Sequence, residues 1–212
     1  MKKVHSVQPD NIYQLHDSVA AEKLYTQWAD TYDNDLLVDM GWQGHIAVAS
    51  RLKKLLSVET ASILDVGCGT GLCGQSLFDN GLVNITGVDL TEAMIAQARE
   101  KQSYVALKIC NATQALPFAD ATFDAVCSAG LFSHGPVLPK HLKHLLGPLK
   151  TGGISIHTIN GLAFAKLDYR DTLDAMAQQG CIEMIDCQAI DYNVKTGVPG
   201  QLVIFRKLES NV

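Results

Sequence analysis

The chain has 212 residues and a mass of 22.9 kDa, enough for a substantial core, so we expect residues 1–212 to form a single domain. Its formal net charge of −5 provides no basic surface for a polyanion, which argues against nucleic acid as a partner. No apolar run reaches the roughly 18 residues that cross a bilayer, so we expect no membrane partner.

Cysteine usage indicates a reducing compartment. The six cysteines include no CxxC pair, and the first residues lack the pattern of a secretory leader. We therefore expect free thiols and a cytoplasmic protein. The cysteines and histidines also lack the spacing of a zinc site, so we expect no metal.

The first quarter of the chain has helical periodicity. Tyr25, Trp28 and Tyr32 recur at near-helical spacing and predict one amphipathic helix. Apolar residues at helical intervals predict a second helix over residues 46–57. We expect residues 1–58 to form an N-terminal helical cap.

From residue 59 onward the pattern changes to short apolar runs that alternate with helices, and two apolar runs close the chain around a turn-rich segment. This alternation predicts an α/β fold with a doubly wound, mostly parallel sheet of seven strands and a C-terminal antiparallel hairpin. The expected strands are 62–66, 84–90, 103–110, 123–130 and 153–160, with the hairpin over 181–208. The expected helices are 72–80, 91–101, 138–150 and 164–180.

A glycine-rich turn follows the first of these strands. Gly67, Gly69 and Gly71 occupy alternate positions, and glycine lets the backbone turn sharply and approach a nucleotide-like ligand. Asp65 precedes the turn and would repel a pyrophosphate about 4 Å away by roughly 1 to 4 kcal/mol. A cationic nucleoside without phosphate fits better, and S-adenosylmethionine (SAM) is such a molecule.

Two further polar residues follow neighbouring strands. Asp89 ends the second strand, where doubly wound nucleotide sites place a carboxylate on the ribose hydroxyls. Asn111 and Ala112 follow the third strand, where an amide can face an adenine amino group. The alternatives are a solvated acid at a strand end and an ordinary turn asparagine.

Three other interpretations stay open. Gly69, Gly71 and Gly74 also satisfy GxGxxG, the fingerprint of a nicotinamide-dinucleotide oxidoreductase, although Asp65 and the lack of a basic residue in the loop argue against it. A non-catalytic module that senses SAM or serves as a scaffold is the second. A tight turn without any ligand is the third.

Several segments in order resemble the successive motifs of class I SAM-dependent methyltransferases, and the resemblance covers roughly residues 24–207. They are ILDVGCGTG, GVDL with TEAMIAQAR, NATQALPF, FDAVCSAG and LKTGGISIHTI. The segments WADTYDNDLLVDMGWQGH and LVIFRKL are similar to the Williams-Beuren syndrome region methyltransferase-like proteins. The resemblance implies methyl transfer from SAM, which becomes S-adenosylhomocysteine (SAH). The acidic charge, and a fourth strand that ends without the paired prolines of nucleic-acid amino-methylating enzymes, lead us to expect an oxygen or nitrogen of a small-molecule acceptor.

The same resemblance implies a set of cofactor-binding residues. Asp65 and the turn residues Gly67, Cys68, Gly69, Gly71 and Leu72 would surround the methionine moiety, which Ala129 and Gly130 would also contact. Asp89 would bind ribose, Leu90 and Met94 would line the adenosine, and Asn111 with Ala112 would meet adenine. Tyr25, Trp28 and Tyr32 would cover the cofactor, unless these rings only pack in the core.

A base is needed only if the acceptor arrives protonated. His134 follows the fourth strand, where open α/β sheets have their ligand crevice, and is our candidate catalytic base. An ordinary loop histidine is the alternative. His157 and His45 are weaker candidates.

Overall fold

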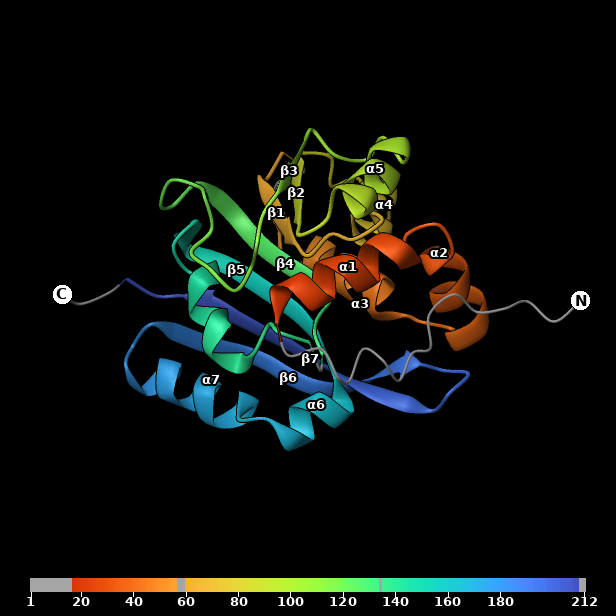
Figure 1. The fold of residues 1–212 in the computed structure, drawn as a ribbon. Coiled ribbons are helices and arrows are strands. Elements are labelled where there is room, and N and C mark those ends of the chain that lie inside the picture. The colour runs from red at the N-terminus through yellow and green to blue at the C-terminus, as the bar shows by residue number, and fades with distance from the viewer. Residues whose placement is uncertain (1–16, 57–59, 134, 210–212) are drawn as a thin grey trace, which may run out of the picture.

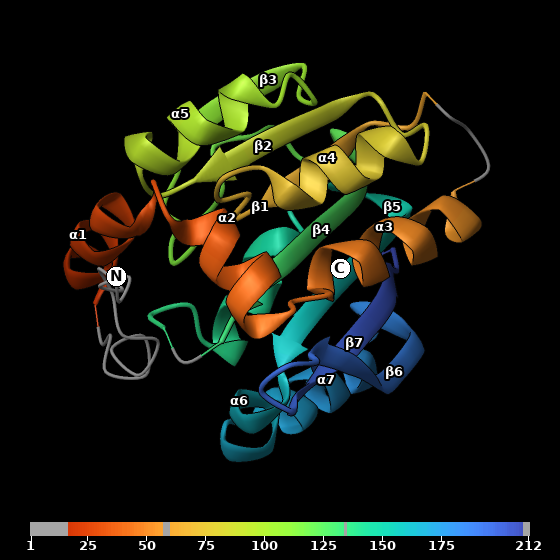
Figure 2. The ribbon, with the colours of Figure 1, turned by 90° about the vertical axis from the view of Figure 1, so that its right-hand side faces the viewer.

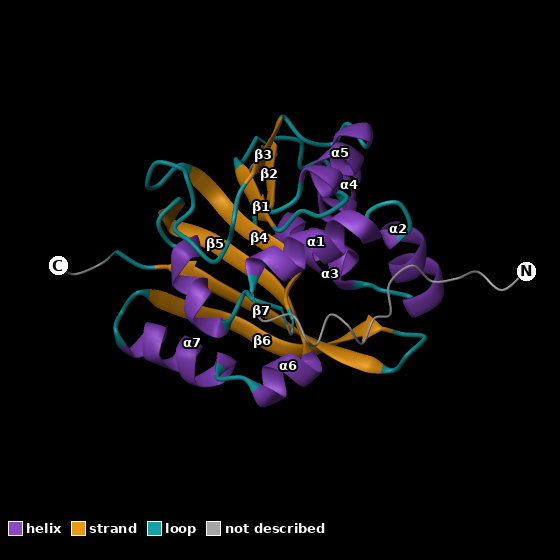
Figure 3. Cartoon of the chain, viewed as in Figure 1, coloured by secondary structure: helices purple, strands orange, loops and turns teal. Residues whose placement is uncertain are grey.

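The computed structural model describes residues 17–56, 60–133 and 135–209, and within them a single sheet of seven strands lies between layers of helices (Figures 1 and 3). The strand order is β3-β2-β1-β4-β5-β7-β6. This arrangement confirms the predicted doubly wound α/β fold. The strands are β1 (Ile63–Val66), β2 (Ile85–Asp89), β3 (Ala106–Ile109), β4 (Phe123–Phe132), β5 (Leu149–Asn160), β6 (Ile182–Asn193) and β7 (Val198–Lys207).

The strand pairing creates a crevice near the middle of the sheet. β1 pairs in parallel with β2 on one side and with β4 on the other, so the chain builds the sheet outward in both directions from β1. Ligands of open α/β sheets bind at such a switch point, outside the carboxyl ends of the strands. β7 pairs antiparallel with both β5 and β6, which confirms the predicted C-terminal hairpin.

Alternation along β1 divides the core between the two faces of the sheet. Leu64 packs in a cluster with residues of α6 (Gly161–Lys166) and α7 (Tyr169–Gln178), whereas Ile63 packs with α3 (Gly44–Leu55) and α4 (Leu72–Asp79). The helix α5 (Glu92–Glu100) contacts β2 and β3. None of the helices in the described ranges is both long and apolar enough to cross a membrane.

The cap is not the single helix that the aromatic spacing predicts. α1 (Ser18–Trp28) ends before α2 (Tyr32–Asn34), and a π-helical segment (Asp35–Met40) follows. The chain folds back because Trp28 Nε1, on a side chain that is 1% exposed, donates a hydrogen bond of 2.7 Å to Asp35 Oδ2. Figure 2 shows α1 and α2 beside the carboxyl ends of the central strands.

The helix predicted over residues 138–150 is also shorter than expected. Only Pro139–Leu145 forms a helix, of the 3₁₀ type, and β5 begins at Leu149. Gly147 and Pro148 explain the difference, because proline cannot continue a helix and both carbonyls accept hydrogen bonds from the segment before β4.

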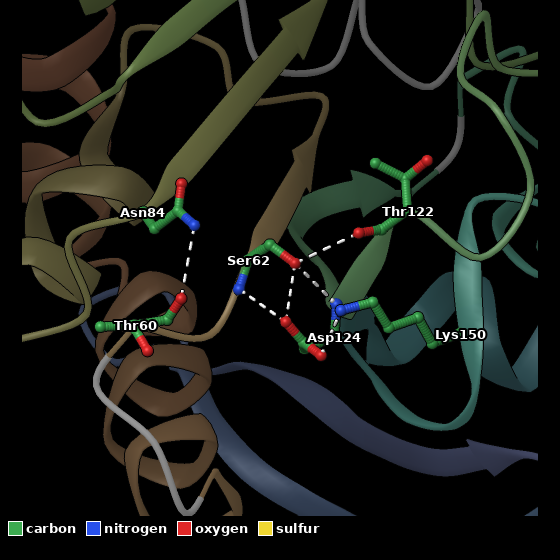
Figure 4. A network of polar contacts seen from close by, with 6 residues as sticks. All are labelled: Thr60, Ser62, Asn84, Thr122, Asp124 and Lys150. Atoms are coloured by element: carbon green, nitrogen blue, oxygen red, sulfur yellow. Dashed lines mark hydrogen bonds and ion pairs between the residues drawn. The ribbon is translucent and has the colours of Figure 1, made fainter.

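A polar network fixes the opposite end of the sheet (Figure 4). Asp124 accepts hydrogen bonds from the Ser62 backbone N–H at 2.9 Å and the Ser62 hydroxyl at 2.7 Å, and pairs with Lys150 Nζ at 2.7 Å. The network joins the amino ends of β1, β4 and β5 and leaves their carboxyl ends for the site.

Candidate functional site

A cavity lies between the carboxyl ends of the central strands and the cap helix α1; we call it the cofactor cavity. It contains most of the residues predicted to bind the cofactor. These are Tyr25, Tyr32, Gly67, Gly69, Asp89, Leu90, Met94, Asn111, Ala112, Ala129 and Gly130. The predicted residues Trp28, Asp65, Cys68, Gly71 and Leu72 do not line it.

The glycine turn forms the floor of this cavity through its backbone. Gly67, Gly69 and Gly71 all have positive φ, of 70°, 54° and 91°, which other residues adopt only with strain. The N–H groups of Gly67 and Cys68 both donate to the Val88 carbonyl, at 2.8 and 2.9 Å, and so tie the turn to the end of β2. The space above Gly69 is open, because an added Cβ would meet no atom within 4 Å.

Asp89 is the only charged side chain among the described residues that line the cofactor cavity. Its Oδ2 accepts the Gly69 N–H at 2.9 Å, and its Oδ1 accepts the Thr91 N–H at 3.1 Å. Burial raises the pKa of the Asp89 carboxyl, while these backbone donors oppose the shift. The donors fix the carboxylate at the cavity wall.

Asn111 connects the core to the cap. Its Oδ1 accepts hydrogen bonds from the Thr113 N–H and hydroxyl, at 2.9 and 2.8 Å, and its Nδ2 donates to Ser18 Oγ at 3.1 Å. Ser18 and Ala21 of α1 also line the cavity, and our sequence analysis missed both. Asp17 was the available signal, because its side chain caps α1 by accepting the Ala20 N–H at 2.8 Å.

Asp65 lies beneath the turn and not in the cavity. Alternation along β1 turns it toward α4, and it is fully buried. Its Oδ2 accepts a hydrogen bond from the Tyr104 hydroxyl at 2.8 Å, and Cys127 Sγ lies 3.8 Å from Oδ1. Burial raises the pKa of Asp65 to about 7, although the bonds from Tyr104 and Cys127 oppose the shift. Asp65 therefore supports the turn from below without lining the cavity.

Tyr104 also explains the third glycine of the GxGxxG pattern. The Gly74 N–H donates to the Tyr104 hydroxyl at 3.1 Å, and a Cβ on Gly74 would lie 2.1 Å from the ring. Glycine is required at this position by the packing of Tyr104, so the pattern needs no dinucleotide phosphate.

Within the described residues, this buried region also contains three side chains of the types that bind metal ions. The donor atoms of Asp65, Cys73 and Cys127 lie within 4.8 Å of one another. The hydrogen bond with Cys73 raises the pKa of the Cys127 thiol, and burial raises it further. Both effects favour protonated thiols, and the absence of a metal stays a prediction.

We expect the variant Asp65→Asn to be most stabilising at alkaline pH. Because the folded-state pKa lies near 7, above the ordinary 3.8, the stabilising contribution of the protonated carboxyl is complete below pH 3.8 and is lost as pH rises through 7. The free energy of unfolding falls by an amount on the order of 4 kcal/mol over this range. The amide of the variant does not ionise, so the variant avoids this loss. Urea unfolding of both proteins at pH 5 and pH 8 measures the difference. A difference in unfolding free energy that does not change with pH would contradict a buried, ionisable Asp65.

A second cavity adjoins the first beneath the cap; we call it the cap cavity. The two cavities share Tyr25, Tyr32, Gly130 and Ser133. Trp42 and Asn193 also line the cap cavity, and an isolated β-bridge joins their backbones. The shared residues therefore form the boundary between the two cavities.

An acidic residue of the cap holds it against the glycine turn. Asp33 accepts hydrogen bonds from the Thr70 hydroxyl and from Lys101 Nζ, the latter at 2.7 Å. Thr70 belongs to the turn and is 2% exposed, while Lys101 follows α5. Asp33 thus joins the cap to both elements beside the cofactor cavity.

We expect Asp33→Asn to accelerate release of a bound cofactor by roughly threefold to tenfold, since a partly exposed ion pair contributes about 1 kcal/mol. Stopped-flow fluorescence of SAH release measures the rate. Asp30→Asn, an exposed neighbour in the cap, is the matched control. Equal release rates in the two variants would show that Asp33 does not hold the cap closed.

Of the three histidine candidates, the two that the structure describes, His45 and His157, line neither cavity. His134 lies outside the described residues, so its role as the catalytic base stays a prediction. His157 is fully buried between Ser128 and Ser155, at 2.8 and 2.7 Å, and burial lowers its pKa to about 3. Burial also lowers the pKa of His45 to about 4, and its ring stacks on Trp42.

A doubly wound sheet with a glycine turn after β1 and a carboxylate at the end of β2 is typical of proteins that bind a nucleoside. Comparison with known proteins identifies the family. Residues 63–153 match the methyltransferase domain family. Methyltransferase-like protein 27 of Homo sapiens is 32% identical over 197 residues, which cover 90% of this chain and 76% of that protein. The chain therefore belongs to the methyltransferase domain family and is a SAM-dependent methyltransferase.

Further similarities concern the fold and the core. The 18S rRNA (guanine-N(7))-methyltransferase of Bos taurus is 33% identical over 98 residues, covering 45% of this chain and 33% of that protein. One similar structure is the complex between the Trm112 methyltransferase activator of Haloferax volcanii and a methyltransferase, with a TM-score of 0.66, 16% identity, and coverage of 87% and 98%. A SAM-dependent methyltransferase of Methanococcus maripaludis has a TM-score of 0.64 at 13% identity, with coverage of 88% and 95%.

These relatives correct one prediction. The acidic charge led us to expect a small-molecule acceptor and no nucleic-acid partner. The exclusion of nucleic acid is wrong, because one relative is an rRNA methyltransferase. The physical reason is that net charge averages over the whole chain and does not describe the surface around one cavity.

Proposed function

We propose that the cofactor cavity binds SAM with its ribose on Asp89. The carboxylate would accept hydrogen bonds from the ribose hydroxyls, with Leu90, Met94 and Ala112 along the adenosine. The methionine end would then lie over the glycine turn, near Ala129 and Gly130. One observation supports this proposal above the others. The only charged side chain among the described residues of the cavity is the Asp89 carboxylate at the end of β2, where it can accept ribose hydroxyls, and no cationic side chain lines the cavity there to offset a pyrophosphate.

We further propose that methyl transfer takes place where the two cavities meet. SAM supplies a methyl group already activated by a positive sulfur. The task of the chain is therefore to orient the acceptor and exclude water. Tyr25, Tyr32, Gly130 and Ser133 line both cavities and would surround the reacting atoms.

Calorimetric titration tests this function. We expect SAM and SAH to bind the full chain with a dissociation constant in the micromolar range, and a nicotinamide dinucleotide to bind much more weakly because of its pyrophosphate. Stronger binding of the dinucleotide, or the absence of SAM binding, would contradict the proposal.

The remaining expectations are proposals of the same kind. We propose that the cap, residues 1–58, and the core, residues 59–212, act as one domain, which the contacts of Asn111 with Ser18 and of Asp33 with Lys101 support. A cytoplasmic location is supported by the free thiols of all six cysteines. Membership in the Williams-Beuren syndrome region group is also a proposal, which rests on the similarity of the segments WADTYDNDLLVDMGWQGH and LVIFRKL.

A further inference from the structure

The cap cavity is rich in aromatic rings and contains no charged residue among those that the structure describes. Five of the eleven residues that line it are aromatic: Tyr25, Trp28, Tyr32, Trp42 and Tyr192. The rings pack against one another, with centroids 4.7 Å apart for Trp28 and Tyr32 and 6.1 Å apart for Trp42 and Tyr192. Such walls favour a flat, uncharged ring and leave an anionic acceptor without a counter-ion.

Two amide side chains on the wall of this cavity offer a ligand one hydrogen-bond donor and one acceptor. Asn160 uses its Oδ1 to accept the N–H groups of Leu162 and Ala163, so its Nδ2 is the group left to donate to a ligand. Asn193 Oδ1 is buried and accepts no hydrogen bond within the described part of the chain. A buried acceptor without a partner is costly, and a ligand N–H would satisfy it.

Apart from Asp89, which we assign to the ribose, no group that is basic at neutral pH lines either cavity within the described ranges. Burial raises the pKa of Tyr25 and Tyr32, which keeps both phenols protonated, and His45 and His157 lie outside both cavities. An acceptor whose nucleophilic atom carries a lone pair and no proton requires no base.

We propose that the cap cavity binds an uncharged heteroaromatic ring that carries both an acceptor nitrogen and an N–H donor, and that a ring nitrogen receives the methyl group. This inference rests on the proposed function. The nitrogen lone pair forms the new N–C bond, the C–S bond breaks, and its electron pair stays on sulfur. No proton leaves, the positive charge moves from sulfur to the ring, and the surrounding aromatic rings stabilise it.

A free heterocycle and a base within a nucleic acid share this chemistry. The experiment therefore uses three probes with the full chain and SAH in calorimetry: 2-aminopyrimidine, guanosine and a short single-stranded RNA that contains guanosine. Aniline, which lacks a ring nitrogen, and benzoate, which is anionic, are the matched controls. Transfer of a labelled methyl group from SAM to each probe, with mass spectrometry of the product, is the second measurement.

We expect at least one heterocyclic probe to bind at least tenfold more tightly than aniline or benzoate, and to yield a product that is methylated at a ring nitrogen and is a cation at pH 5. Preference for the RNA identifies a nucleic-acid acceptor, and preference for a free ring identifies a small one. Asn193→Leu should weaken heterocycle binding about tenfold while SAH binding stays unchanged.

Two results would overturn the proposal. One is SAH binding without binding or methylation of any heterocyclic probe. The other is an Asn193→Leu variant that binds SAH and the best heterocycle as the wild type does. Loss of SAH binding in the wild type is a different result, because it contradicts the proposed function itself.

Discussion

The variant Asp89→Ala is expected to lose SAM binding by roughly 100-fold. Two hydrogen bonds from ribose hydroxyls to a carboxylate contribute about 3 kcal/mol together, and their loss gives that factor. The substitution also leaves the N–H groups of Gly69 and Thr91 without their acceptor, which loosens the glycine turn. Asp89→Asn keeps one acceptor oxygen, so its affinity for SAM should lie between those of Asp89→Ala and the wild type. Calorimetric titration with SAM and SAH measures both.

Asp79→Asn is the matched control, because Asp79 is an exposed acid at the end of α4. Thermal unfolding of each variant separates a loss of binding from a loss of fold. An Asp89→Ala protein that is folded and binds SAM within a factor of two of the wild type would remove Asp89 from the site.

The variant Gly74→Ala is expected to destabilise the protein by about 1 to 3 kcal/mol, because its Cβ would overlap the partly buried Tyr104 ring. Helix propensity alone predicts the opposite sign, since alanine is favoured over glycine inside α4 by about 1 kcal/mol. The displaced ring would also lose its hydrogen bond to Asp65, so the turn above Asp65 should bind SAM less tightly. Urea unfolding and SAM titration measure the two effects.

A double-mutant comparison isolates the cause. In a Tyr104→Ala background, which removes the ring, Gly74→Ala should cost much less or become stabilising. The same cost in both backgrounds would show that the ring is not what excludes a side chain at position 74.

The sequence predicts the part of the site that local structure determines. Asp89 and Asn111 follow directly on strands, and the glycines follow β1, so the parallel sheet alone brings them to one edge. The same reasoning misplaced Asp65, because its partner Tyr104 is 39 residues away in the chain. Alternation with Ile63 was the signal that Asp65 faces α4.

Contacts between distant segments account for the other differences. The hydrogen bond from Asn111 to Ser18 spans 93 residues, and no local pattern reveals it. The contact between Asp33 and Lys101 spans 68 residues and depends on how the cap folds back after Trp28. The exclusion of nucleic acid from the net charge was wrong for a related reason, because net charge carries no information on where the charges lie.

A crystal structure of the protein with SAH tests whether Asp89 binds the ribose. We expect both ribose hydroxyls to lie within hydrogen-bonding distance of the Asp89 carboxylate, with the sulfur near Tyr25 and Tyr32 at the entrance to the cap cavity. SAH bound elsewhere, or bound with the Asp89 carboxylate turned away from the ribose, would contradict this expectation.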